Sequence, residues 1–223
     1  MQNIINTVKS EFKIFFRAMI ERKNAWIFLP IIFSLTVTYI SFFLSFESIL
    51  HKGNNEIIAI ILMSIVPVIL FSLVLLSRFA FIYSFFFILA LNFLIRELDA
   101  SVWNLPIIGE FKLRTKEYIY FAICIMFLWA IWKIEKVQAF FSENPFARKL
   151  FLSMFITYLF SQLVARRIFR NIFPDEKQIH IPLEEITENF AHFVFLLFAI
   201  TILIYFIKKV HSKRKSILFS GEK

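Results

Sequence analysis

Six long apolar runs constrain what this 223-residue chain can fold into more than any other feature. The runs lie at about residues 26–46, 56–76, 78–95, 117–132, 149–166 and 188–207. A helix of about 20 apolar residues crosses the roughly 30 Å of hydrocarbon in a bilayer. Soluble domains are typically half apolar, whereas 59% of this chain is hydrophobic and 32 of its residues are Phe. The sequence therefore predicts an all-α fold, a polytopic membrane helix bundle of about six transmembrane helices.

Residues 1–25 have a different pattern from the apolar runs. Apolar residues recur there at helical spacing, and Asn, Lys and Arg residues occupy the opposite face. A helix of this kind lies in the membrane interface with its basic face toward anionic headgroups. We therefore expect three parts: an amphipathic interfacial helix at 1–25, a six-span transmembrane domain at 26–207 and a basic cytoplasmic tail at 208–223.

Local signals predict features of individual helices. Ser142-Glu143-Asn144-Pro145 is typical of a turn that starts a new helix, and the last helix is expected to begin after Pro182. Pro30 and Pro67 lie within runs, where they start or kink helices. Hydroxyl groups of the first run are expected to bond backbone carbonyls or neighbouring helices. These hydroxyls belong to Ser34, Thr36, Thr38, Ser41 and Ser45.

The distribution of charge predicts the orientation of the bundle. If the N-terminus is cytoplasmic, most of the 25 Lys and Arg residues fall on the inner side and most of the 16 acids on the outer side. This asymmetry favours both termini in the cytoplasm of a bacterial-type inner membrane. The net charge of +9 is then a topology signal. It predicts anionic lipid headgroups as partners on the cytoplasmic side, and no nucleic acid.

Charged and polar residues gather at three predicted helix ends, all on the outer side. The third run ends in Arg96, Glu97 and Asp99, and the fifth ends in Arg166 and Arg170. The start of the last helix adds a further set: Glu184, Glu185, Glu188, Asn189 and His192. Ionisable groups close to hydrocarbon are costly, so they usually have a partner or a function. The sequence predicts that these three helix ends form one polar cluster.

Three interpretations of this cluster are open. In the structural interpretation, its acids and bases pair with one another and hold three helices in register. In the second, the arginines bind the phosphate or carboxylate of a ligand or lipid through their planar guanidinium groups. In the third, a carboxylate beside His192 works as an acid–base pair in catalysis.

A metal site is a narrower variant. Glu188 and His192 are four residues apart and could share an ion with Asp99 or His180. However, the chain has only four His residues, no H-E-x-x-H motif and a single cysteine, Cys124, inside an apolar run. The sequence favours no metal and no cofactor.

Two of the helix-end motifs carry a family resemblance. Arg96-Glu97-Leu98-Asp99 and Glu184-Glu185-Ile186-Thr187-Glu188 resemble the R-E-x-D and E-E-x-x-E motifs of a group of uncharacterised bacterial multi-pass membrane proteins. The likeness covers about residues 78–207. It departs from the group after Asp99, where basic residues are expected and Ala100-Ser101-Val102 stand. The resemblance implies no particular activity.

The sequence therefore predicts an integral inner-membrane protein that is a binding or assembly component with an outward-facing cluster. Another membrane protein is one partner that such a component would have. The alternative is a membrane-embedded enzyme that modifies lipid headgroups, with Glu188 and His192 acting beside Arg96 and Arg166. A transporter is less expected, because the three Gly residues are predicted to lie in loops and the charges are predicted to lie at one face. An enzyme predicts a cavity between the helix ends and a carboxylate without an arginine partner, and a purely structural cluster predicts neither.

Overall fold

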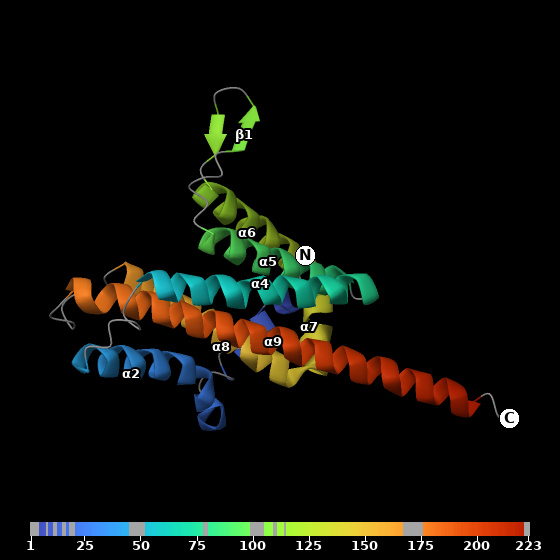
Figure 1. Cartoon of the computed structure of the whole chain (residues 1–223). Helices are drawn as coiled ribbons and strands as arrows, with labels where there is room; N and C mark the ends of the chain where they lie inside the picture. Colours follow the sequence, from blue (N-terminus) through green and yellow to red (C-terminus); the bar gives the residue numbers. More distant parts are fainter. Residues whose placement is uncertain are drawn as a thin grey trace.

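Helices make up almost all of the part of the chain that the computed structural model describes (Figure 1). The described residues are 5–7, 9–10, 13–14, 17, 21–44, 52–77, 80–98, 105–108, 111–113, 115–166 and 176–220. In chain order the elements are η1 (Arg22–Phe28), α2 (Leu29–Phe43), α4 (Lys52–Leu76), α5 (Ala80–Glu97), β1 (Leu105–Ile108), β2 (Phe111–Leu113), α6 (Thr115–Trp132), α7 (Ile134–Glu143), α8 (Pro145–Ala165) and α9 (Glu176–Ser220).

Three stretches of helix are long and apolar enough to cross a membrane: Asn24–Phe43, Gly53–Leu76 and Ile179–Ser212. Each coincides with a predicted apolar run, so the prediction of a helical membrane protein is confirmed. The helices α5, α6 and α8 coincide with the other three runs, and the count of six spans stays a prediction. Of the amphipathic helix expected at 1–25, the described residues 5–7, 9–10, 13–14 and 17 are helical, and Arg22–Phe28 form a 3₁₀ helix. The other residues before 21 lie outside the described part of the chain, and the amphipathic interfacial helix stays a prediction.

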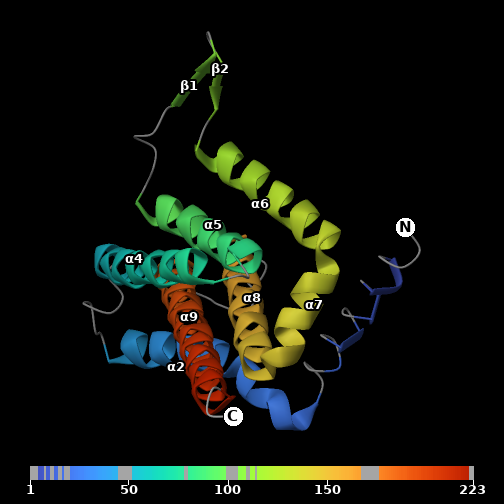
Figure 2. The same ribbon diagram turned by 90° about the vertical axis from the view of Figure 1, so that its right-hand side faces the viewer.

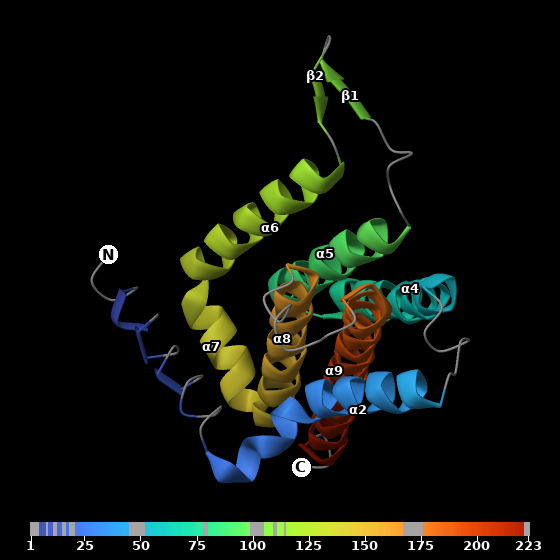
Figure 3. The ribbon, with the colours of Figure 1, turned by 90° about the vertical axis from the view of Figure 1, so that its left-hand side faces the viewer.

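The long helix α9 occupies the centre of the bundle. It packs against α2, α4 and α8, while α5 packs on α4, and α6 on α5. Figure 1 shows α4 and α9 side by side and the C-terminal part of α9 projecting beyond the other helices. Figures 2 and 3 show α6 and α7 as an arc that leads from the hairpin of β1 and β2 to the start of α8. Between α5 and α6, the strands β1 and β2 form an antiparallel hairpin in which Leu105 pairs with Leu113.

Aromatic rings fill the core between α4, α5, α8 and α9. Phe86 of α5 is buried, and its ring centroid lies 4.7 Å from that of Phe198 and 5.4 Å from that of Phe151. Both pairs have tilted edge-to-face geometry, which adds to the attraction from burial alone. Phe side chains, which are abundant in this chain, thus pack α5, α8 and α9 against one another.

Small and hydroxyl side chains join α2 to α9. Ser34, Thr38 and Ser41 are buried on one face of α2, and the Thr187 hydroxyl of α9 lies 3.0 Å from the Ser34 hydroxyl. The hydroxyls of Ser34 and Thr38 donate to the carbonyls of Ile31 and Ser34, each at 2.8 Å. The expected role of these hydroxyls is confirmed for Ser34, Thr36 and Thr38.

Proline marks two helix starts and lies inside two other helices. Pro30 is in the first turn of α2, and α8 begins at Pro145 as predicted. The prediction that the last helix begins after Pro182 is wrong, because α9 begins at Glu176 and contains Pro182. A proline there removes one backbone hydrogen bond. Ile179 and Leu183 lie on either side of it and are buried, and this packing offsets the loss.

Candidate functional site

Arg96, in the last turn of α5, faces two carboxylates. It bonds the Oε2 atom of Glu188 in α9, and its Nη2 atom lies 3.4 Å from Oε1 of the neighbouring Glu97. The side chains of Glu188 and Glu97 are only 5% and 7% exposed. Among the described residues, the guanidinium of Arg96 therefore pairs with two acids that water hardly reaches.

The Glu188 carboxylate also connects α9 to α8. Its Oε1 atom accepts hydrogen bonds from the Ser161 hydroxyl at 3.0 Å and the Gln162 amide at 3.2 Å. With Arg96 on its other oxygen, this carboxylate is held from three directions. Because hydrogen bonds to a charged acceptor are stronger than neutral ones, the contact joins α5, α8 and α9 at one end of the bundle.

His192 lies one turn after Glu188 and is fully buried. Its Nε2 atom is 3.7 Å from Oε1 of Glu97, and neither ring nitrogen has a hydrogen-bond partner among the described residues. The Tyr158 and Phe93 rings pack beside it, with centroid distances of 5.4 and 6.4 Å. His192 is therefore enclosed by aromatic rings and lies close to one carboxylate.

The structure thus brings together four of the ten residues predicted to form the cluster: Arg96, Glu97, Glu188 and His192. Asn189 contacts a different helix, since its amide donates to the Asn55 backbone carbonyl of α4 at 3.1 Å.

The other predicted members have different places. Glu184 and Glu185 are half-buried in α9, one turn before Glu188. Arg166 is exposed at the C-terminal end of α8. Asp99 and Arg170 lie outside the described residues.

Within the described ranges, no group of three His, Cys, Asp or Glu side chains is placed to hold a metal ion. His180 precedes Glu188 by two turns of α9, about 12 Å along the helix axis. This separation keeps the two side chains from sharing one ion.

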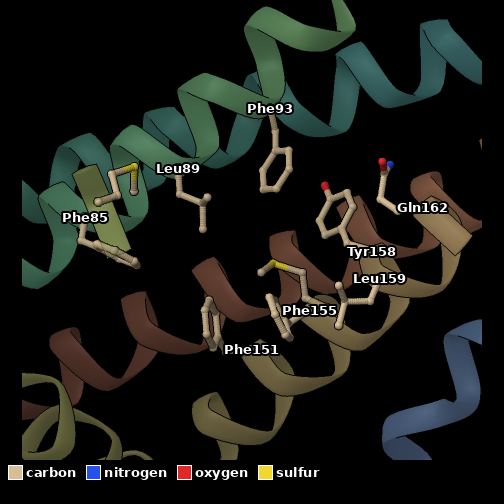
Figure 4. A pocket seen from close by; sticks show the side chains of 10 residues that line it. Phe85, Leu89, Phe93, Phe151, Phe155, Tyr158, Leu159 and Gln162 are labelled. Atoms are coloured by element: carbon tan, nitrogen blue, oxygen red, sulfur yellow. The ribbon is translucent and has the colours of Figure 1, made fainter. Parts of the chain in front are cut away.

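A cavity of about 180 Å³ adjoins the cluster, between α5, α6 and α8 (Figure 4). Its lining is almost entirely apolar, with Phe and Leu side chains from α5 and α8 and Met126 from α6. Two polar residues of α8, Tyr158 and Gln162, complete the lining, and Figure 4 places them together, away from Phe85. Gln162 belongs to both features, because its amide also donates to Glu188.

Sequence reasoning did not include Tyr158, Ser161 or the cavity in the predicted cluster. Uncharged polar residues are common in apolar helices, and their direction depends on how each helix is rotated. The one available signal was that Tyr158, Ser161 and Gln162 recur at helical spacing in the outer half of the fifth run.

The chain matches no known family model, no curated protein and no solved structure. The two helix-end motifs therefore remain a resemblance only, and the function has to be argued from the geometry.

Proposed function

We propose that this chain is a six-span inner-membrane protein with both termini in the cytoplasm, and that it is a binding component rather than an enzyme. The ligand site is the cavity between α5, α6 and α8, which reaches toward the outer side at Gln162. Arg96 and Gln162 lie near the C-terminal ends of their helices, and Glu188 lies in the first part of α9. Because successive spans alternate in direction, these three positions belong to the same side of the membrane, the outer side in this topology.

The observation that carries the proposal is the Arg96 guanidinium shared by two buried carboxylates. Removing one partner of a buried ion pair leaves an uncompensated charge, so such a network holds its helices in one arrangement. The helices held in this way, α5 and α8, are those that line most of the cavity. The cluster thus keeps the cavity in one shape, and the binding sites of small molecules are usually preformed in this way.

Binding is favoured over catalysis by the positions of the charged groups. Among the described residues, Arg96, Glu97, Glu188 and His192 are not part of the cavity lining. A general acid or base must come within hydrogen-bond reach of its substrate. His192 is separated from the cavity by the Phe93 and Tyr158 rings, which are themselves part of the lining.

The lipid-modifying enzyme stays as the second candidate, because one observation favours it. His192 lies 3.7 Å from Glu97, and a His beside a carboxylate is a common acid–base arrangement. This candidate requires the Phe93 and Tyr158 rings to move aside when substrate binds.

The test is native mass spectrometry of the purified protein and of an Arg96→Ala, Glu188→Ala double variant. Changing both residues avoids leaving Glu188 charged without its arginine, but Glu97 stays buried without it. Circular dichroism and size-exclusion chromatography therefore have to show that the double variant is folded. We expect a discrete additional mass on the wild-type protein and its loss from the double variant. Arg166→Ala, a change of an exposed arginine at the end of α8, is the matched control and should keep the mass. A bare wild-type protein would contradict the binding function.

A further inference from the structure

Two buried polar groups of the Arg96 cluster face each other without a hydrogen bond. In the described part of the chain, the Oε1 atom of Glu97 accepts no hydrogen bond, and neither ring nitrogen of His192 has a partner. The distance from Oε1 of Glu97 to Nε2 of His192 is 3.7 Å, and these side chains are 7% and 0% exposed. Buried polar groups are nearly always hydrogen-bonded, and a proton between these two atoms would give each of them a partner.

The charges that act on Glu97 do not balance. Among the described groups that act most strongly on it, the one cation is Arg96. The others are acids: Glu188, Glu185 and Glu56. The Arg96 guanidinium is bonded to Glu188, whose carboxylate accepts two further hydrogen bonds from α8. An ionised Glu97 would therefore add an unbalanced negative charge where water hardly reaches, and a buried group in this position neutralises by taking up a proton.

The surroundings of His192 indicate which of the two side chains carries the proton. His192 is fully buried, and the rings of Phe93 and Tyr158 lie beside it. A protonated imidazole would place a full charge among these rings, whereas a protonated carboxyl group is neutral. A neutral imidazole keeps one nitrogen as an acceptor, so Nε2 can accept from Glu97. Tyr158 is the titratable group of α8 at this place, and a phenol is uncharged near neutral pH.

From this geometry we infer that Glu97 and His192 form a proton-binding site, in which the Glu97 carboxyl keeps its proton at neutral pH and donates it to Nε2 of His192. The proton exchanges with the water at Arg96, whose side chain is 33% exposed. Its release leaves one net negative charge between α5 and α9, so the contact between these helices weakens as the pH rises. This site goes beyond the proposed binding function, because the proton is held by the cluster and not by the cavity.

The first experiment compares the unfolding of the wild type with that of Glu97→Gln. Above about pH 7 an ordinary glutamate and an ordinary histidine in the unfolded chain have lost their protons, whereas the folded wild type still holds one. A state that binds more protons loses stability as the pH rises, so the unfolding equilibrium constant of the wild type should increase by up to about tenfold per pH unit. Glu97→Gln has no such proton, and its constant should change much less.

Denaturant unfolding in detergent, followed by circular dichroism between pH 7 and pH 9, makes this comparison. Glu135→Gln, which removes an exposed carboxylate of α7, is the matched control and should follow the wild type. The same pH dependence for the wild type and Glu97→Gln would overturn the inference.

Infrared spectroscopy of the wild type detects the proton directly and does not depend on the folding of a variant. A protonated carboxyl group has a C=O stretching band apart from those of carboxylates, and ordinary Asp and Glu side chains are ionised at pH 7. In a detergent without ester groups, after removal of lipid, we expect this band in the wild type and in Glu135→Gln, and its loss from Glu97→Gln. A wild-type protein without the band at pH 7 would overturn the inference.

His192→Phe tests the acceptor, because it keeps a ring in the same place and removes both nitrogens. The Glu97 carboxyl should still be protonated in this variant, but its O–H group no longer donates to Nε2. We therefore expect the C=O band to remain and to move to higher frequency. An unchanged band position would overturn the role of His192 in holding the proton.

Discussion

Arg96 is the residue on which the buried cluster depends. Glu97 and Glu188 both lie against its guanidinium, and neither side chain is more than 7% exposed. Removing one partner of a buried ion pair costs more free energy than the intact pair contributes to stability, because the remaining charge stays buried without a partner.

We therefore expect Arg96→Ala to lower the free energy of unfolding by about 3–5 kcal/mol. Arg166→Ala should change it by less than about 0.5 kcal/mol, as is usual for exposed positions. Denaturant unfolding of the two variants in detergent, followed by circular dichroism, makes the comparison. Equal stabilities for the two variants would show that Glu97 and Glu188 do not need the arginine.

Part of this cluster could be predicted from the sequence. Acids, Arg96 and His192 next to hydrocarbon are unusual enough to stand out. The sequence places Arg166 in the cluster because it ends the fifth run, but α8 ends at Ala165 and Arg166 is exposed beyond it. The shared use of Arg96 by two acids depends on how α5 and α9 meet, which no single helix pattern contains.

Among the elements, α7 and α9 are joined by a contact on the side assigned to the cytoplasm. The Glu143 carboxylate accepts hydrogen bonds from the Lys209 ammonium at 2.8 Å and from the Tyr205 hydroxyl at 2.6 Å. These bonds, with that from Lys209 the stronger cause, lower the pKa of Glu143 below its usual value. The side chains of Lys209 and Glu143 are 39% and 46% exposed, so solvent screens much of the attraction.

The lowered pKa gives a pH dependence with a definite sign. A carboxyl group that is more acidic in the folded state stabilises the fold above its unfolded pKa, and the effect is lost as the pH falls through the folded pKa. At pH 7 we expect the free energy of unfolding of the wild type to exceed that of Glu143→Gln by about 0.2–1 kcal/mol, the usual range for an exposed ion pair.

At pH 3 the difference in free energy of unfolding between the wild type and Glu143→Gln should be smaller, because the Glu143 carboxylate takes up a proton. Unfolding curves of both proteins at the two pH values measure it, and Glu135→Gln, an exposed change on the same helix, is the control. A difference that persists unchanged at pH 3 would exclude this carboxylate as its source.

The elements themselves were more predictable than their ends. Each apolar run coincides with a helix, because apolar length is sufficient to define one in a bilayer. The start of α9 was not predictable, since a proline normally argues against helix on its N-terminal side. Only the tertiary burial of Ile179 and Leu183 explains why the helix continues through Pro182.

For the whole molecule, the orientation in the membrane is the property that most needs a direct measurement. The native Cys124 is exposed on α6 within an apolar run, so lipid should shield it from a water-soluble maleimide. Asn54, at the start of α4, and Ser142, at the end of α7, are both exposed. The proposed topology puts Asn54 outside and Ser142 in the cytoplasm.

We expect a membrane-impermeant maleimide to label Asn54→Cys in intact spheroplasts, and to label Ser142→Cys only after lysis. The wild-type protein, with Cys124 alone, should remain unlabelled in both states. The opposite order for the two variants would reverse the proposed topology and place the cluster on the cytoplasmic side.

The helix α9 is continuous from Glu176 to Ser220, so the rotation of the helix that sets Glu188 and His192 in the cluster also sets Tyr205 and Lys209 at the contact with α7. Each residue added to an α-helix turns everything beyond it by about 100°. One residue inserted between His192 and Tyr205 would leave Glu188 and His192 in place and rotate Lys209 away from Glu143 by more than a quarter turn. The number of residues in this stretch, more than their identity, aligns the two sides of the molecule, and the stretch should tolerate substitution better than insertion or deletion.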